Sequence, residues 1–397
     1  MKLLRVGLAL LTGALGSASA ASGASPAPPP DGQAPPQVEW HATVEAGRAA
    51  ARESDRLVLL YFWIEGSSFC EAIYRDVLTS ERGAVELGNF ACVSVRADDP
   101  AASSLLTELG VTRLPTLAFT RADGAPEDAL PGGLDLETFL REAARIRRGE
   151  RTVSDWRGRA AAKPDDLDVR LQLGLQLEHV GEATEASELF ESIKRDDPDG
   201  ATVAGAQLHL YDVFAEVRNA AGNPSDSGTY ELAPLYAHMP KVKPLEIQHE
   251  GWRWITDVEK QRGDRVRERA AWPRLWKTAA DEETRMECGF RALLRYFEMG
   301  EGLGAKDLRF CSDVLRHFES NTADRPGLVA PAFVHHARAI THALHGRRDE
   351  ALVEVERAIA LAPDVALHQR LRDLLQPTAA ATPEASEAGE ASDDGDG

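Results

Sequence analysis

One stretch of the sequence passes from strand to helix within a few residues, and it reads Leu57-Val58-Leu59-Leu60-Tyr61-Phe62-Trp63-Ile64-Glu65-Gly66-Ser67-Ser68-Phe69-Cys70. The apolar and aromatic run from Leu57 to Trp63 is typical of a short strand buried on both faces. Gly66-Ser67-Ser68 ends this strand. Apolar residues then return at the spacing i, i+4 and i+8 of a helix, at Phe69, Ile73 and Val77. A strand therefore leads directly into a helix here.

The flanking segments continue the alternation of helices and strands. Residues 43–53 have a helical composition rich in Ala, Glu and Arg. After the helix that reaches residue 78, the pattern predicts a strand at 90–95, a helix at 101–109, a strand at 116–120, a turn at 121–124 and a helix at 135–147. The order is βαβ followed by ββα, so the sequence predicts an α/β domain.

Two motifs in this region resemble those of thioredoxin-like proteins. Residues 62–70 resemble the turn between the strand and the active-site helix. The second motif, Gly110-Val111-Thr112-Arg113-Leu114-Pro115-Thr116-Leu117, resembles the loop that carries a cis-proline. The resemblance covers residues 38–148 and implies a thioredoxin-like fold in which Pro115 is cis.

The resemblance does not extend to all of the catalytic residues. Thiol-disulfide exchange requires an exposed thiolate at a helix N-terminus and a second thiol three residues later. Ser67 stands at the first position, and a serine hydroxyl cannot form a disulfide. Cys70 matches the second position. Further departures are Gly66, where the family usually has Trp, Phe69, where many members have Pro, and Tyr61, where thioredoxins have a buried Asp.

Two interpretations of this turn remain open. In the first, Ser68-x-x-Glu71 is a capping box and Cys70 is a small buried apolar residue. The site would then bind an extended peptide without chemistry, through Ser67, Ser68, Phe69, Leu114 and Pro115. In the alternative, Cys70 is the catalytic residue of a monothiol oxidoreductase whose exchange relies on a thiol of the partner.

The second half of the chain is predicted to be all-α. Residues 165–200 resemble a tetratricopeptide repeat through Leu173-Gly174, Leu177, Gly181, Ala186, Phe190, Ile193 and Pro198. Residues 331–364 repeat the pattern less perfectly. Helical patterns at 207–220, 250–267, 282–298 and 305–318 lie between them, with a long loop expected at 222–243. Repeats thus fill residues 164–376, joined to the first domain by a linker at 149–163.

Three groups of side chains in this half could form a binding, disulfide or metal site. Trp252, Trp254, Trp272 and Trp276 form either a helix-packing core or a binding platform. Cys288 and Cys311 fit a disulfide across a helical hairpin, or two unpaired buried thiols. The histidines His335, His342 and His345 lie near one helix face, but this spacing is no known ligand motif. We therefore predict neither a metal nor a cofactor.

The two ends of the chain predict an exported protein. Residues 1–20 carry Lys2 and Arg5, an apolar run and the small-residue ending Ala18-Ser19-Ala20, which together are typical of a cleaved signal peptide. The apolar run is too short to span a membrane. A proline-rich linker (21–37) follows, and an acidic, disordered tail (377–397) closes the chain. We expect a periplasmic or secreted protein without membrane insertion.

Composition limits the partners. The 397 residues carry a formal charge of -19, which would repel a nucleic acid. A neutral or basic protein or peptide fits better. The sequence thus favours a non-catalytic protein that binds polypeptides or scaffolds an envelope complex, and it leaves the oligomeric state undetermined.

Overall fold

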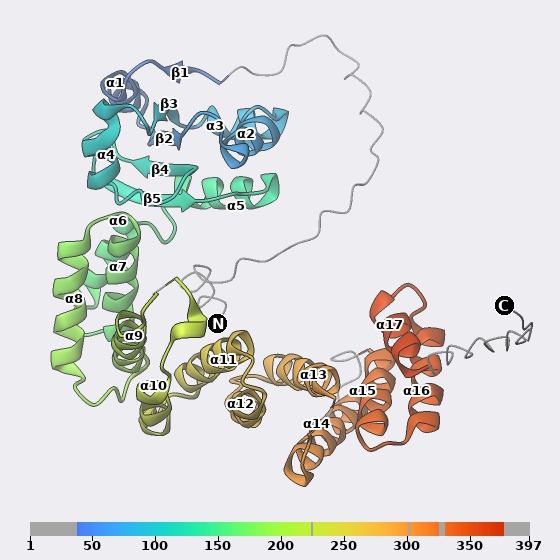
Figure 1. The fold of residues 1–397 in the computed structure, drawn as a ribbon. Coiled ribbons are helices and arrows are strands. Elements are labelled where there is room, and N and C mark those ends of the chain that lie inside the picture. The colour runs from blue at the N-terminus through green and yellow to red at the C-terminus, as the bar shows by residue number, and fades with distance from the viewer. Residues whose placement is uncertain (1–37, 224, 301, 325–329, 377–397) are drawn as a thin grey trace, which may run out of the picture. The chain divides into compact units, whose positions relative to one another are not determined.

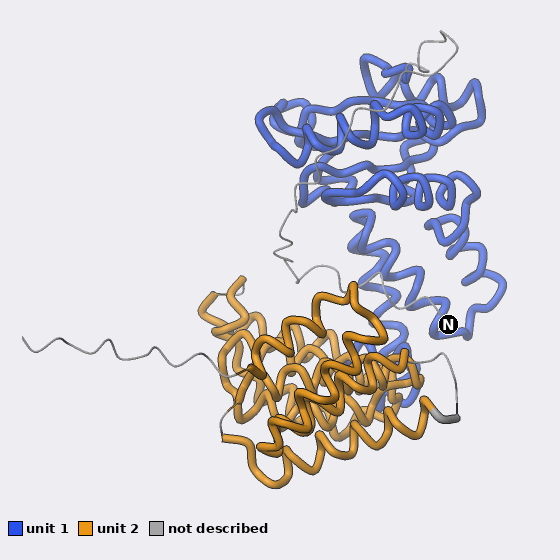
Figure 2. The backbone as a smooth tube through the Cα atoms, turned by 90° about the vertical axis from the view of Figure 1, so that its right-hand side faces the viewer, with its two compact units in different colours: residues 1–209 blue, residues 210–397 orange. Residues whose placement is uncertain are grey.

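The computed structural model describes residues 38–223, 225–300, 302–324 and 330–376. The predicted signal peptide (1–20), proline-rich linker (21–37) and acidic tail (377–397) lie outside these ranges. The chain divides into two compact units, residues 1–209 and 210–397, which are shown in different colours in Figure 2. This division falls inside helix α9 (Val203–Asn219), downstream of the linker predicted at 149–163.

The first unit contains one mixed sheet. In the described part of the chain its strands are β1 (Trp40–His41), β2 (Val58–Trp63), β3 (Ala91–Arg96), β4 (Thr116–Thr120) and β5 (Pro126–Pro131), and their order across the sheet is β1-β3-β2-β4-β5 (Figure 1). Strand β2 pairs parallel with β3 and antiparallel with β4, and β5 pairs antiparallel with β4. The sheet confirms the thioredoxin-like α/β fold predicted from the two motifs.

Both faces of this sheet are covered, as the unbroken apolar run of β2 predicts. Alternate residues of a strand point to opposite faces. Accordingly, Leu59 and Tyr61 belong to one buried cluster, whereas Leu60 and Phe62 belong to the other. The helices α2 (Ser68–Ile73), α3 (Glu81–Leu87) and α5 (Leu136–Arg147) contribute to the first cluster. The helix α1 (Val44–Ser54) contributes to the second, and α4 (Ser103–Glu108) packs against it.

Three local features of this domain differ from the sequence prediction. The helix expected over residues 69–78 consists of α2 followed by a π-helical turn, Tyr74–Leu78, in which the Thr79 N–H donates to the Tyr74 carbonyl at 2.9 Å. Helix α3 and the short strand β1 were not predicted. Strand β1 has two residues, too few to show any periodicity.

The first helices after the sheet form a tight pair. Helices α7 (Leu167–His179) and α8 (Ala183–Asp196) match the repeat predicted at 165–200. A Cβ atom on Gly174 would lie 2.4 Å from Cε1 of Phe190, so any larger residue at this crossing would have to displace the Phe190 ring. The segment predicted as a linker contains a further helix, α6 (Val153–Ala162), whose Val153 and Trp156 are buried in the same cluster as Leu177 of α7.

The second unit is built from helices throughout its described residues. They are α10 (Ala233–His238), α11 (Leu245–Arg262), α12 (Arg265–Lys277), α13 (Glu282–Met299), α14 (Ala305–Asp324), α15 (Pro331–Leu344), α16 (Arg348–Leu361) and α17 (Ala366–Leu375). Helices α15 and α16 match the second predicted repeat. Within the described residues, no helix is long and apolar enough to cross a membrane.

Two predictions for this unit were wrong. The long loop expected at 222–243 contains α10, and its Tyr230, Leu235 and Met239 are buried. Tertiary burial thus overrides a composition rich in glycine and proline. The single helix expected at 250–267 is interrupted at Gly263, whose φ of 72° ends α11 in the left-handed conformation that favours glycine. The tryptophans Trp252, Trp254 and Trp272 are buried, as the core interpretation requires.

Candidate functional site

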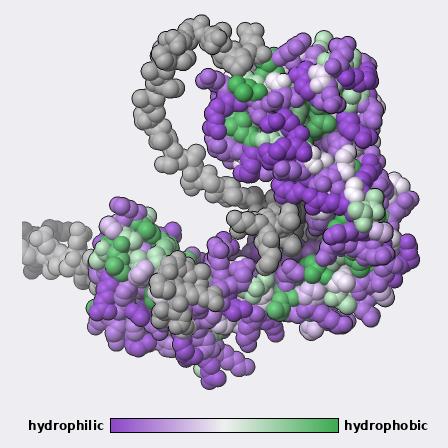
Figure 3. All heavy atoms as spheres, turned by 180° about the vertical axis from the view of Figure 1, so that it is seen from behind, coloured by the Kyte–Doolittle hydropathy of each residue, from purple (hydrophilic) through white to green (hydrophobic). Residues whose placement is uncertain are grey.

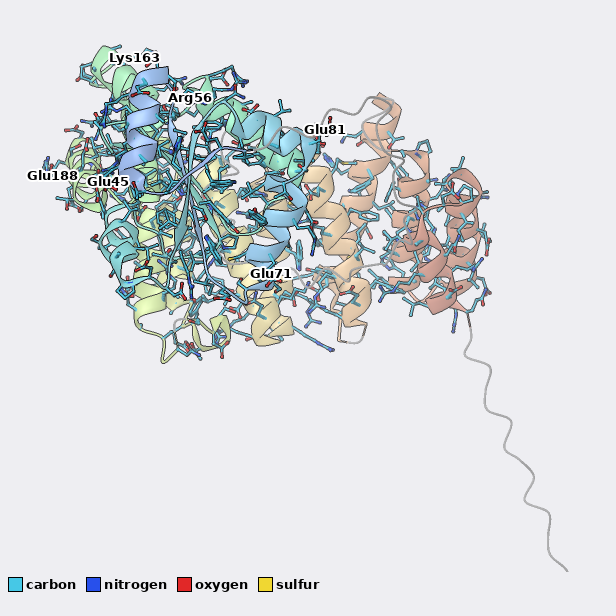
Figure 4. All side chains as sticks on the ribbon, turned by 90° about the horizontal axis from the view of Figure 1, so that it is seen from above. Glu45, Arg56, Glu71, Glu81, Lys163 and Glu188 are labelled. Atoms are coloured by element: carbon cyan, nitrogen blue, oxygen red, sulfur yellow. The ribbon has the colours of Figure 1, made fainter. Side chains whose placement is uncertain are left out.

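The turn between β2 and α2 is capped one residue earlier than the sequence predicts. Ser67 has an extended backbone, and its Oγ accepts a hydrogen bond from the Cys70 N–H at 3.4 Å, so Ser67 and not Ser68 is the N-cap. Ser68 is the first residue of the helix. Glu71 consequently occupies the fourth helical position instead of the third, where the capping box requires it. The carboxylate of Glu71, labelled on α2 in Figure 4, is left exposed to solvent.

Cys70 lies beneath this turn, in the core. Its side chain is 2% exposed, and its backbone carbonyl accepts a hydrogen bond of 2.9 Å from the Tyr61 hydroxyl. Burial raises the pKa of Tyr61 well above its ordinary value, so this side chain is a neutral phenol at physiological pH. Tyr61 therefore anchors the start of α2 and is no proton acceptor for the thiol.

An aromatic side chain stands exposed on the same helix. Phe69 is 68% exposed, and Tyr74 at the start of the π-helical turn is also exposed. The Phe69 ring lies near the turn between β5 and α5, because a Cβ atom on Gly133 would be 3.9 Å from Phe69 Cδ1. Figure 3 shows apolar patches on the surface of unit 1 within a largely polar surround. Exposed aromatic residues of this kind mark candidate contact surfaces.

The loop that carries Pro115 adjoins the turn between β5 and α5. The Leu114-Pro115 peptide bond is cis, as the resemblance implies. The Pro115 carbonyl accepts a hydrogen bond from the Gly132 N–H at 2.7 Å, and the Thr116 hydroxyl donates to the Arg113 carbonyl at 2.7 Å. Gly132 and Gly133 thus connect the proline loop to Phe69.

Leu114 itself is half-buried, and no hydrogen bond from the described residues reaches its backbone. Of the predicted peptide-binding residues, Ser68 and Phe69 are exposed and Ser67 and Leu114 are half-buried, whereas Pro115 is buried. We call Phe69, Leu114 and the Gly132-Gly133 turn the Phe69 surface. Tyr74 and the glycine turn were missed from the sequence, and only the Gly-Gly pair signalled a turn there.

The other predicted groups do not converge on a site. Among the described residues all four cysteines are free and buried, Cys288 and Cys311 included. Burial raises the pKa of Cys288 to about 11 and that of Cys311 to about 12. His335 pairs with Glu354 at 2.6 Å and His345 with Ser312 at 3.2 Å, so these two histidines have separate partners. The described ranges hold no group of three or more His, Cys, Asp or Glu side chains arranged to bind a metal ion.

The chain was compared with protein families, curated proteins and solved structures. No family model matches the sequence, and no curated protein matches it either. A thioredoxin from Thermus thermophilus is similar to 28% of this chain over 86% of its own length, with 26% identity and a TM-score of 0.26. A tetratricopeptide repeat protein from Parabacteroides merdae is similar to 60% of this chain over 81% of its own length, with 13% identity and a TM-score of 0.23.

The strand order and the paired helices themselves define the architecture. The chain consists of a thioredoxin-like domain followed by tetratricopeptide-like helical repeats.

Proposed function

We propose that the thioredoxin-like domain binds extended polypeptide segments at the Phe69 surface, without thiol-disulfide exchange. The observation that carries this proposal is the 68% exposure of Phe69 next to a loop whose Leu114 backbone has no partner among the described residues. A backbone N–H and C=O without intramolecular partners can pair with the backbone of a peptide. Burial of an aromatic side chain under that peptide contributes about 1.5–3 kcal/mol.

The chemistry of the turn supports binding in place of exchange. The hydroxyl of Ser67 is used as a helix cap, and it cannot attack a disulfide. The Cys70 thiol is buried, whereas a reactive cysteine must be accessible as a thiolate. The monothiol oxidoreductase, the alternative left open by the sequence, therefore gains no support from the position of Cys70.

The proposed partners are neutral or basic polypeptides, in keeping with the formal charge of -19. We further propose that the helical repeats provide a second protein-binding surface, so that the chain scaffolds an envelope complex. Export to the periplasm or the medium is proposed on the pattern of residues 1–20 alone, which lie outside the described residues.

Binding is tested with reduced, carboxyamidomethylated lysozyme, an unfolded cationic chain with blocked thiols. We expect the full chain to bind this fluorescently labelled probe, measured by anisotropy, and Phe69→Ala to raise the Kd about tenfold, which corresponds to about 1.4 kcal/mol of lost apolar contact. Val85→Ala is the matched control, because Val85 is an exposed apolar residue of the same domain on α3. Equal loss in both variants, or no binding by the wild-type chain, would refute the proposal.

A further inference from the structure

A pair of buried histidines joins the last described helix, α17, to α15. His336 of α15 and His368 of α17 are both 0% exposed, and their Nδ1 atoms are 2.8 Å apart. We propose that this pair is a pH-sensitive latch, and that its protonation releases α17 from the end of the helical repeats. The latch is independent of the Phe69 surface, which belongs to the other unit.

The hydrogen bond between the two rings requires at least one of them to be neutral, because one Nδ1 must accept through its lone pair. A neutral imidazole carries one N–H, so one Nδ1 donates while the other Nδ1 accepts through its lone pair. An imidazolium has a proton on both nitrogens. If both rings are protonated, two N–H groups face each other, the hydrogen bond is lost, and two positive charges lie 2.8 Å apart at their nearest atoms.

The surroundings offer no compensation for such charges. Neither Nε2 atom has a hydrogen-bond partner among the described residues. Apolar phenylalanine rings pack against the pair. The ring centroid of Phe290 on α13 lies 5.4 Å from that of His336, and the centroid of Phe333 on α15 lies 5.3 Å from that of His368. A buried charge without a partner is strongly unfavourable.

Several charged side chains on the packed helices form ion pairs with one another. They form the pairs Glu287 with Arg291 on α13, Glu319 of α14 with Arg338 of α15, His335 of α15 with Glu354 of α16, and Arg372 with Asp373 on α17. None of these pairs includes a latch nitrogen. Burial lowers the pKa of His336 to about 3, helped by the nearby His368, and burial also lowers the pKa of His368.

The direction of the pH effect follows from these shifts. An exposed histidine has a pKa of about 6.5, so both rings bind protons more readily after release than in the latch. The stabilisation by the pair is therefore complete above about pH 6.5 and falls as the pH decreases toward the lowered pKa values. Each histidine raises the opening equilibrium constant up to about tenfold per pH unit, and the two together up to about a hundredfold.

Helix α17 is the element that can respond without loss of the whole unit. It follows the second repeat, and it is also held by the buried Leu371 and Leu375, by a hydrogen bond from Arg348 of α16 to the Leu375 carbonyl and by one of 2.8 Å from the Gln369 amide to the Pro363 carbonyl. A terminal helix with few anchors opens locally before the rest of a fold. Its release exposes His336 of α15 to water, where the ring accepts its proton.

Hydrogen exchange of the full chain, followed by mass spectrometry at pH 7.5 and pH 5.0 and corrected for intrinsic rates, tests the latch. We expect the protection of residues 368–375 to fall at least tenfold at pH 5.0, while α15 retains most of its own. His368→Gln keeps a hydrogen-bonding side chain that does not titrate, so only His336 responds in this variant, and the fall in α17 protection should be at most about tenfold per pH unit in place of about a hundredfold. His345→Gln is the control, because His345 is exposed and its ring bonds Ser312, so this variant should keep the wild-type response.

The wild-type measurement decides the matter even if His368→Gln does not fold. Unchanged protection of α17 at pH 5.0 would overturn the proposal. Simultaneous loss of protection in α17 and in the other helices of its unit would also overturn it, since this indicates general acid unfolding.

Discussion

Replacement of Arg145 by alanine is expected to lower the free energy of unfolding of unit 1 by about 3–5 kcal/mol, the usual cost of removing one partner of a buried ion pair. Arg145 of α5 is 8% exposed. Its Nη2 bonds Asp128 Oδ2 at 2.6 Å, its Nε bonds Glu142 Oε2 at 2.7 Å, and its Nη1 bonds the Glu150 carbonyl at 2.6 Å. Burial alone would lower the pKa of Arg145, but the two carboxylates outweigh it and raise the pKa, so the guanidinium is charged.

The loss of stability arises mainly from the buried Asp128 carboxylate that the substitution leaves without its cation. Asp128 is a buried residue of β5, and without Arg145 its carboxylate has lost its closest cation. Urea unfolding, with hydrogen exchange of β2 and β5 as the probe of unit 1, measures the effect. Arg148→Ala is the control, since its pair with Glu150 is exposed and should leave the midpoint unchanged. A midpoint for Arg145→Ala equal to that of this control would contradict the prediction.

The second large effect is expected in the helical repeats. Glu268 of α12 is 0% exposed, and Arg295 of α13 holds both of its oxygens, with Nε to Oε1 at 2.7 Å and Nη2 to Oε2 at 3.1 Å. Arg295→Ala leaves this carboxylate buried without its cation. We expect the free energy of unfolding of unit 2 to fall by about 3–5 kcal/mol.

The same helix supplies a matched control for this prediction. Arg291 of α13 pairs with Glu287 at 2.7 Å, but both side chains are exposed, so Arg291→Ala should leave the urea midpoint unchanged. The double variant Glu268→Leu, Arg295→Met removes both charges and should recover part of the loss. Equal midpoints for Arg295→Ala and Arg291→Ala would show that the buried pair contributes nothing.

The sequence predicted those elements whose pattern is set by local burial. The run from Leu57 to Trp63 is apolar without interruption because both faces of β2 are covered, so composition alone revealed the strand. The helical stripe of Phe69, Ile73 and Val77 was less informative. Ile73 and Val77 are buried, yet Phe69 is exposed, and the π-helical turn starts between the first two residues and the third. The helical spacing alone placed Phe69 in the core, whereas its position beside the turn placed it among the predicted peptide-binding residues.

Other features depend on contacts that the sequence does not display. Either serine of the pair Ser67-Ser68 fits a cap, and the choice depends on where the backbone becomes helical. Likewise, the segment 149–163 has the charged composition of a linker, but Ser154 of α6 bonds Glu127 of β5 through its backbone N–H at 3.1 Å. That contact joins residues distant in the sequence, so a local pattern could not predict it.

The central claim, binding without thiol exchange, is tested most directly by mass spectrometry of the intact full chain after incubation at neutral pH with a peptide that carries an activated mixed disulfide. We predict that the folded protein forms no peptide adduct at Cys70, and that an adduct appears only after denaturation in urea. A peptide disulfide formed at Cys70 of the folded protein, as fast as at the unfolded thiol, would contradict the claim and establish Cys70 as a nucleophile.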